Sequence, residues 1–172
     1  MSSNPDPALV FTDANILINL IHIDRLHLLR DLTNLEFVVP EPVAVEIRRP
    51  SQRKRFDQSR AEGAFKIELL TDIEELTLYA TLRKMMGDGE AACLAMASSR
   101  GAYVATSDKK RKFLREAKRF LPAGRLMNLT DLLILAIQED HLTIQEADQA
   151  KEFLETHHRF KLKFRSFADF LG

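Results

Sequence analysis

Short apolar runs that alternate with longer segments of helical periodicity constrain the fold of this chain more than any other feature. Each run is short enough for a buried strand, and each intervening segment has the length of one or more helices. Strands joined in this way lie parallel, with helices on the faces of their sheet. The sequence therefore predicts an α/β protein with a mostly parallel sheet. The predicted strands are Ala8–Thr12, Glu36–Val39, Phe65–Leu70, Ala102–Thr106 and Arg125–Asn128.

Helices are predicted from the spacing of apolar residues and from residues that favour helix ends. Pro42 suits a first helical turn, and Pro50 is expected to end that helix. Thr71 and Asp88 are expected to cap the helices that follow them. The polar and basic segment Ser51–Ala61 could be either a loop or a helix. The predicted helices are Asn15–Asp31, Pro42–Arg48, Asp72–Met86, Gly89–Ser99, Lys109–Arg119, Asp131–Glu139 and Thr143–Glu155.

The chain of 172 residues is predicted to form one domain over residues 1–172, because this length suffices for a single hydrophobic core. Residues 134–172 are expected to be a C-terminal helical extension packed on that domain. Packing is the favoured role of the phenylalanines near this end, with base stacking or binding of a protein partner as the alternatives. These are Phe153, Phe160, Phe164, Phe167 and Phe170.

The composition is that of an ordinary soluble globular protein, with 45% hydrophobic and 29% charged residues. Cys93 is the only cysteine, so no intramolecular disulfide can form. The polar segment Met1–Pro7 lacks the pattern of a signal peptide, and no apolar stretch has the length of a membrane span. We therefore expect a cytoplasmic protein without a membrane partner.

Four carboxylates stand where an α/β fold would bring them together. Asp13 and Asp108 each follow a predicted strand, and the carboxyl ends of parallel strands meet at one edge of a sheet. Glu46 and Glu90 lie on predicted helices among apolar or small neighbours. Taken singly, each acid could instead be a helix cap, a solvated residue or a first-turn carboxylate. Their order and local contexts together favour a shared site.

Converging carboxylates repel one another unless cations hold them together. Hard divalent ions take oxygen ligands, so Mg²⁺ or Mn²⁺ is the expected cofactor. Such an ion lowers the pKa of a bound water and stabilises charge on a phosphoryl oxygen. The acids therefore predict metal-dependent phosphodiester hydrolysis.

With these residues in view, the sequence resembles the PIN-domain family of nucleases over roughly residues 8–133. The segments that carry the resemblance are Asp13-Ala14-Asn15, Glu90 with the alanines after it, and Thr106-Ser107-Asp108, with Glu46 as the remaining acid. It implies a three-layer α/β/α sandwich and cleavage of single-stranded RNA. It also implies that Asp13, Glu46, Glu90 and Asp108 are catalytic residues and metal ligands, supported by Asn15 and Thr106.

The resemblance leaves two points open. Lys109 and Lys110 stand where many family members place a further acid, so one or two metal ions remain as alternatives. Small bacterial and archaeal members are often toxins of the VapC type that pair with an antitoxin, and family members often form homodimers. A toxin role, an antitoxin and a second copy of the chain are therefore expectations from the family alone.

The net charge of zero conceals two basic segments beside the predicted site. Residues 48–60 hold six basic residues against one acid, and residues 109–119 hold seven against one. One segment begins just after Glu46 and the other just after Asp108. Since lysine and arginine supply most sequence-independent affinity for nucleic acid, we expect RNA contacts there rather than merely solvated faces. The predicted contacts are Arg48, Arg49, Arg53, Lys54, Lys109, Lys110 and Arg111.

Two other functions are alternatives to that of a ribonuclease. A phosphatase of the haloacid-dehalogenase type would need a second aspartate where this chain has Asn15, and an acidic pair that Ser107-Asp108 does not supply. A catalytically silent RNA- or protein-binding module of the same fold would usually have lost some of the four acids. The presence of all four favours an enzyme.

Overall fold

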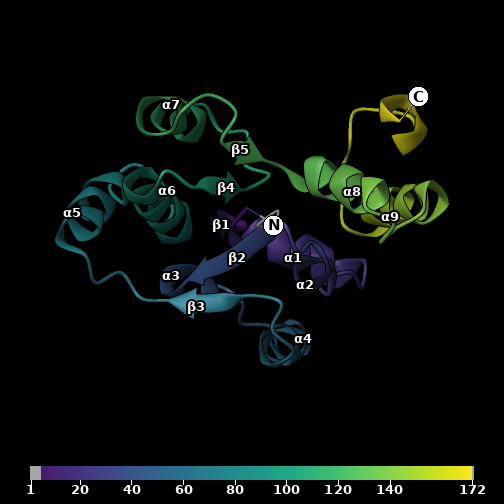
Figure 1. Cartoon of the computed structure of the whole chain (residues 1–172), viewed down its shortest axis with the longest axis horizontal. Coiled ribbons are helices and arrows are strands. Elements are labelled where there is room, and N and C mark those ends of the chain that lie inside the picture. Colours follow the sequence, from purple (N-terminus) through teal and green to yellow (C-terminus); the bar gives the residue numbers. More distant parts are fainter. Residues whose placement is uncertain (1–4, 172) are drawn as a thin grey trace.

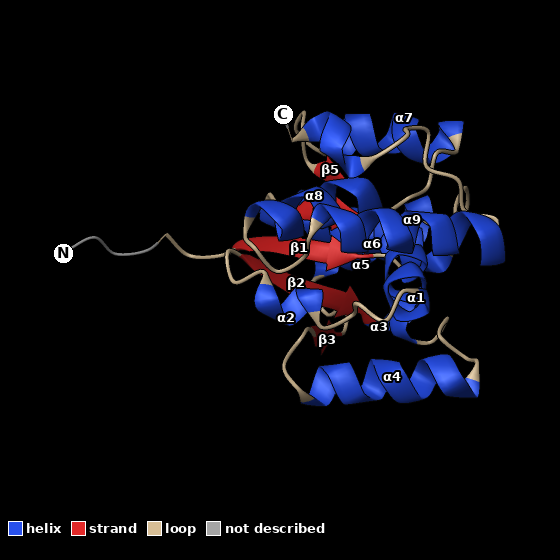
Figure 2. Ribbon diagram, turned by 90° about the vertical axis from the view of Figure 1, so that its right-hand side faces the viewer, coloured by secondary structure: helices blue, strands red, loops and turns tan. Residues whose placement is uncertain are grey.

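The structure, a computed structural model, describes residues 5–171 and contains a five-stranded sheet. The strand order is β3-β2-β1-β4-β5, and every neighbouring pair is parallel. In Figure 2 the arrowheads of β1 and β2 point the same way. The strands are β1 (Ala8–Thr12), β2 (Leu35–Pro40), β3 (Lys66–Glu68), β4 (Tyr103–Ala105) and β5 (Leu126–Met127). The predicted parallel sheet is confirmed, although β3, β4 and β5 are shorter than expected.

Helices cover both faces of this sheet, which confirms the three-layer α/β/α arrangement. Figure 1 shows α3, α5, α6 and α7 on one side and α1, α2, α4, α8 and α9 on the other. Among residues 5–171, no helix is long and apolar enough to cross a membrane. The helices are α1 (Ala14–His22), α2 (Leu28–Asp31), α3 (Glu41–Ala44), α4 (Pro50–Ala61), α5 (Ile73–Leu82), α6 (Asp88–Arg100), α7 (Arg111–Phe120), α8 (Leu129–Gln138) and α9 (Ile144–His157), with a 3₁₀ turn η1 (Phe167–Phe170).

Two predicted helices and the predicted role of Pro50 differ in the structure. The helix predicted over 15–31 is split, because the backbone at Asp24 adopts a positive φ of 55° that a right-handed helix cannot contain. The helix predicted over 42–48 ends at Ala44, and isolated hydrogen-bonded turns follow it as far as Ile47. Pro50 does not stop that helix but begins α4, as the first helical position tolerates its missing N–H.

Two predicted helix caps were also wrong. Asp72, not Thr71, caps α5 by accepting hydrogen bonds from the N–H groups of Glu74 and Glu75. Gly87 is the N-cap of α6, while Asp88 lies in the first turn and pairs with Arg83 at 3.2 Å. The caps of α8 and α9 are capping boxes built on Asn128 and Thr143.

Helix α6 supports the middle of the sheet. Residues 91–97 are all fully buried, and the helix packs on β1, β2 and β4 on one side and α5 on the other. Four of those seven residues are alanine, so the helix backbone approaches the strands closely. This close approach fixes the start of α6, where Glu90 lies, over the carboxyl ends of the strands.

The C-terminal segment folds back onto α9. The Ser166 hydroxyl and the Phe167 N–H donate to the Asp148 carboxylate at 2.6 and 2.8 Å, and Phe167 is fully buried. Buried apolar residues from Val10 to Phe167 form one continuous cluster. The assignment of 1–172 as one domain, with 134–172 as its extension, stays a prediction, and residues 1–4 and 172 lie outside the described range.

Truncating Phe167 should destabilise the protein far more than truncating its neighbour Phe170. Phe167→Ala removes a fully buried ring and should lower the free energy of unfolding by about 3–5 kcal/mol. Phe170 is 49% exposed, so Phe170→Ala should cost much less. Urea denaturation of both variants measures the difference, and equal losses would mean that the tail does not pack as described.

Candidate active site

Asp13 lies at the centre of the candidate site, directly after β1. It caps α1, since its Oδ1 accepts a hydrogen bond from the Ala14 N–H at 2.8 Å. Its Oδ2 accepts from the Thr106 hydroxyl at 3.2 Å and from the Asn15 amide at 3.3 Å. The residue is only 4% exposed. Asp13 therefore has both roles that its position suggested, as a helix cap and as a member of the cluster.

The loop after β4 is tied to Asn15 and Thr106. The Ser107 N–H donates to Oδ1 of Asn15 at 3.1 Å, and the Asp108 N–H donates to the Thr106 hydroxyl at 3.1 Å. Asn15 also donates to Thr106 at 3.4 Å. These bonds hold Asp108 beside Asp13, so the two predicted supporting residues join the two predicted acids.

Asp108 has one satisfied and one unsatisfied carboxylate oxygen. Its Oδ1 accepts from the Lys110 N–H at 2.8 Å. Its Oδ2 is buried without a hydrogen-bond partner among residues 5–171. A buried carboxylate oxygen without a donor is costly unless a ligand or water satisfies it, which makes this atom a candidate ligand for a cation.

Glu90, in the first turn of α6, faces the same cluster. Its side chain is 15% exposed, and its Oε1 lies 3.8 Å from Nζ of Lys110. Burial is the largest cause that raises the pKa of Glu90 to about 7, followed by a hydrogen bond of its protonated form with the Asp108 side chain and by the charges of Asp108 and Asp13. The charge of Lys110 only partly opposes this rise. The same causes, burial first and the charge of Asp108 later, raise the pKa of Asp13.

Glu46 reaches the cluster from the turn after α3. Its Oε1 accepts a hydrogen bond from the Gly89 N–H at 3.2 Å. Partial burial of the carboxyl group and the charge of Asp13 raise the pKa of Glu46, although the residue as a whole is exposed. A Cβ at Gly89 would lie 2.6 Å from that Oε1, so only glycine admits this contact.

The donor set suits a hard divalent cation, although it does not form a closed cage. Within residues 5–171, no three His, Cys, Asp or Glu side chains surround one point closely enough to enclose a metal ion. Mg²⁺ commonly keeps several waters and binds one or two carboxylates, so such a cage is not required. The unsatisfied Oδ2 of Asp108 and the raised pKa values of Asp13, Glu46 and Glu90 are what an uncompensated cation site would show.

Comparison with known proteins identifies the family. A family model described as a PIN domain matches residues 9–156, a range that contains all four acids. The chain belongs to the PIN-domain family. A search of curated proteins gave no match. The five-stranded parallel sheet with helices on both faces is consistent with the α/β/α fold of that family, as the resemblance had implied.

The predicted RNA contacts of this PIN domain divide into two groups. Arg48, Arg49 and Lys54 are exposed, and so is the run from Lys109 to Arg111. Arg53 is half-buried, because it donates to the Ala44 carbonyl at 2.7 Å and pairs with Asp57 at 3.2 Å. An RNA contact by Arg53 would compete with these bonds. The other cations are exposed, although Arg48 donates to the Val45 carbonyl at 3.1 Å and Lys110 lies 3.8 Å from Glu90.

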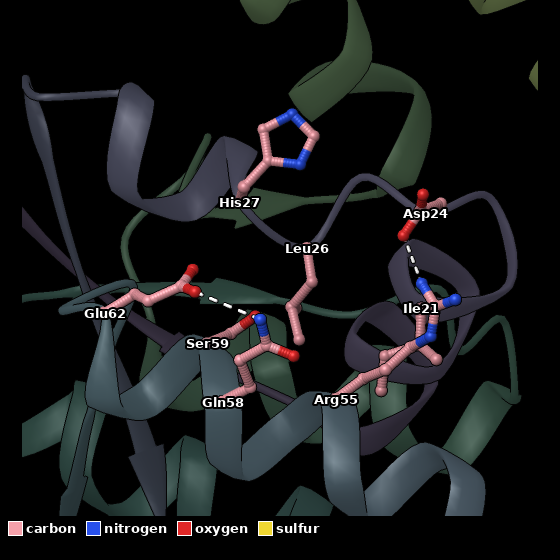
Figure 3. A pocket seen from close by; sticks show the side chains of 8 residues that line it. All are labelled: Ile21, Asp24, Leu26, His27, Arg55, Gln58, Ser59 and Glu62. Carbon is pink, nitrogen blue, oxygen red and sulfur yellow. Dashed lines mark hydrogen bonds and ion pairs between the residues drawn. The ribbon is translucent and has the colours of Figure 1, made fainter.

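A cavity of about 160 Å³ between α4 and the connection from α1 to α2 is separate from the acids (Figure 3). Its walls include Arg55, which pairs with Asp24, and Gln58, which donates to Glu62 at 3.2 Å. The Arg55–Asp24 ion pair offsets one positive charge of the basic segment on α4. The cavity contains none of the predicted site residues.

The part played by Gly89 was not predicted from the sequence. A glycine in the first turn of a helix is unfavourable, and it therefore indicates that another group approaches the backbone closely. The Gly87-Asp88-Gly89-Glu90 segment contained that signal, but the partner, Glu46, lies 43 positions away. Lys110, predicted only as an RNA contact, is likewise a counter-ion of Glu90.

Removing the charge of Glu90 should stabilise the metal-free protein near neutral pH. The pKa of Glu90 rises from an ordinary 4.5 to about 7 on folding. The folded protein then binds the proton more tightly than the unfolded chain, so stability falls as pH rises from about 4.5 to 7. Glu90→Gln avoids this loss, and its melting temperature relative to the wild type should increase across that window.

Thermal melts in the presence of EDTA test this at several pH values. Glu152→Gln, on the exposed side of α9, is the matched control and should shift by the same small amount throughout. A constant difference between Glu90→Gln and the wild type from pH 4.5 to 8 would show that Glu90 is not held among uncompensated carboxylates.

Proposed function

We propose that this PIN domain is a metal-dependent endoribonuclease that hydrolyses phosphodiester bonds of single-stranded RNA with Mg²⁺ or Mn²⁺. The observation that supports it most directly is that burial and the nearby charge of Asp108 raise the pKa of Asp13 and of Glu90, while Oδ2 of Asp108 is buried without a hydrogen-bond partner among residues 5–171. Perturbed carboxylates gathered in one place are more typical of a functional site than of a structural one. The ordered set of four acids extends that inference to Glu46.

Asp13, Glu46, Glu90 and Asp108 would hold the ion. When bound, Mg²⁺ or Mn²⁺ supplies Lewis-acid stabilisation of the phosphoryl oxygens and a lowered pKa for the attacking water. Asn15 and Thr106 fix the orientation of the Asp13 carboxylate through its Oδ2. The raised pKa of Glu90 belongs to the metal-free protein, and a bound cation would offset the carboxylate repulsion that contributes to it.

The cations at the beginnings of α4 and α7 would bind the RNA backbone. Arg48 and Arg49 follow Glu46, and Lys109 and Arg111 follow Asp108. Phosphate contacts of this kind position a strand without recognising its sequence. We therefore propose that Arg48, Arg49, Lys54, Lys109, Lys110 and Arg111 guide the strand to the acids, with Arg53 a weaker member of the set.

The cellular setting belongs to the same proposal. We include a cytoplasmic location as a prediction from the sequence. A toxin role of the VapC type, an antitoxin partner and a homodimer are predictions that rest on the family. The toxin role would be supported if a small neighbouring gene encodes a DNA-binding protein and that protein co-purifies with this chain. Its absence would favour an RNA-processing role.

Asp13→Asn should abolish cleavage while the protein folds normally. The amide keeps an acceptor for the Ala14 N–H, and it removes a carboxylate whose pKa burial already raises. Loss of one metal ligand should reduce the rate by about 100-fold or more, since the metal contributes several kcal/mol to the transition state. Cleavage of a mixed single-stranded RNA pool with Mn²⁺ measures the rate, and EDTA should stop the wild-type reaction.

Asp140→Asn is a suitable control, because Asp140 is exposed and its φ of 61° is tolerated by asparagine. It should cleave at the wild-type rate. An undiminished rate in Asp13→Asn would remove Asp13 from the site. RNA binding by the wild type without any cleavage would favour the catalytically silent module instead.

Gly89→Ala should separate the position of Glu46 from the stability of α6. The new methyl group would lie 2.6 Å from Oε1 of Glu46 and 3.1 Å from Val43, so the Glu46 carboxylate must move. We expect a loss of activity of roughly 10–100-fold, as for other changes that displace a metal ligand, with the fold retained. Circular dichroism and the RNA cleavage assay measure the two effects.

Gly87→Ala is the matched control two positions earlier. A Cβ at Gly87 would meet Glu90 only at an ordinary contact distance of 3.9 Å. It should therefore retain most of the activity. If Gly89→Ala were as active as Gly87→Ala, Glu46 would have no part in catalysis.

A further inference from the structure

A cavity of about 350 Å³ opens beside the candidate active site. Its walls come from the loop after β4, the N-terminal turn of α8 and the C-terminal segment after α9. Ser107 and Lys109, which flank Asp108, belong to the first of these walls. The volume lies in the range of pockets that bind small ligands.

The cavity continues toward the acids. A smaller hollow of about 170 Å³ is lined by Thr106 and Asp108, and it shares Ser107, Lys109 and Asn128 with the larger cavity. A chain that passes Asp108 can therefore place one of its substituents in the larger cavity. The position makes the cavity an extension of the site rather than a separate one.

Three phenylalanine rings form the apolar wall of the cavity. These are Phe160, Phe164 and Phe170. Phe164 packs edge-on against Phe170 with ring centroids 4.9 Å apart, and it makes the same contact with the buried Phe167. Nζ of Lys151 lies 5.5 Å from the centre of the Phe164 ring. The aromatic wall is thus held in place before any ligand arrives.

Polar groups also line the cavity. The Ser107 hydroxyl is buried and has no hydrogen-bond partner among residues 5–171. Asn128 and Asp131 also line the cavity, and their capping box engages one side-chain oxygen of each. Lys109 and Lys163 are exposed at the cavity. The cavity therefore combines a flat apolar surface, hydrogen-bonding groups and cations.

We propose that this cavity binds an unpaired nucleobase of the RNA strand whose backbone passes Asp108. A base matches each part of the lining: its face suits the phenylalanines, its polar edge suits Ser107 and Asn128, and its flanking phosphates suit Lys109 and Lys163. The proposal rests on the proposed ribonuclease function and adds to it a reason for acting on single strands. A base paired in a helix is stacked and cannot enter such a pocket.

Binding of a short single-stranded RNA that contains 2-aminopurine tests the pocket independently of cleavage. The protein is the full chain with Asp13→Asn, supplied with Mn²⁺. Stacking of the base on the rings should quench its fluorescence. Adding Phe170→Ala should abolish the quenching and weaken binding by about 5- to 100-fold, the range that loss of one stacking contact implies.

Phe153→Ala is the matched control, because Phe153 is a similarly exposed phenylalanine, 41% against 49%, that does not line the cavity. It should bind RNA as tightly as the parent. An RNA with one abasic position provides a second test that needs no change in the protein. The abasic RNA should bind the parent protein more weakly than the intact RNA does, by the same factor that Phe170→Ala produces. Adding Phe170→Ala should then weaken the binding of the abasic RNA little further.

The outcomes separate the two proposals. One outcome is that the wild type cleaves RNA with metal while neither Phe170→Ala nor the abasic position changes the binding affinity. That result would overturn the proposed base pocket and leave the proposed ribonuclease function in place. Quenched, pocket-dependent binding without cleavage by the wild type would support the pocket and overturn the ribonuclease. A third outcome is that RNA binds without quenching and that Phe170→Ala weakens binding of intact and abasic RNA equally. It would overturn the pocket and show that Phe170 contacts another partner, such as a protein side chain.

Discussion

The parallel pairing of β1 with β4 is the contact on which the rest of the candidate site depends. It sets Thr12 opposite Ala105, and the Asp13 N–H extends the ladder by donating to the Ala105 carbonyl at 2.9 Å. The next side chains then meet, so that Thr106 donates to Asp13 across 93 positions of sequence. A slip of one residue would turn every side chain of a strand to the opposite face and separate these groups. The buried alanines of α6 press on both strands and hold this register.

Folding gathers these carboxylates at a cost in electrostatic free energy. Burial is the main cause that raises the pKa of Asp13, Glu46 and Glu90, and mutual repulsion adds to it. Three backbone N–H groups, those of Ala14, Gly89 and Lys110, offset part of the cost by donating to Asp13, Glu46 and Asp108. The electrostatic cost that remains favours the binding of a cation, since an ion that binds only the folded state stabilises it. The same geometry that weakens the empty fold would give it affinity for metal.

Much of this arrangement follows from local sequence, and the parts that do not are long-range. The apolar runs predicted all five strands, and the parallel topology that they imply brings Asp13 and Asp108 to one edge. By contrast, the break at Asp24 and the replacement of Thr71 by Asp72 as a cap depend on competing local geometries that composition does not rank. The contact between Glu46 and Gly89 was beyond prediction, because it joins two turns whose distance only the packing of α3 on α6 decides.

The basic residues show why the net charge of zero says little about binding. The two basic helices, α4 and α7, lie at opposite ends of the sheet, so they do not form one positive surface (Figure 1). Within α4, ion pairs with Asp57 and Asp24 engage Arg53 and Arg55. Among the exposed cations, those at the beginnings of the helices come just after Glu46 and Asp108 in the sequence. Long-range attraction from such a balanced molecule is weak beyond a Debye length of about 8–10 Å. Selection of the strand must then depend on contacts made within the site, which is where a pocket for a single base would act.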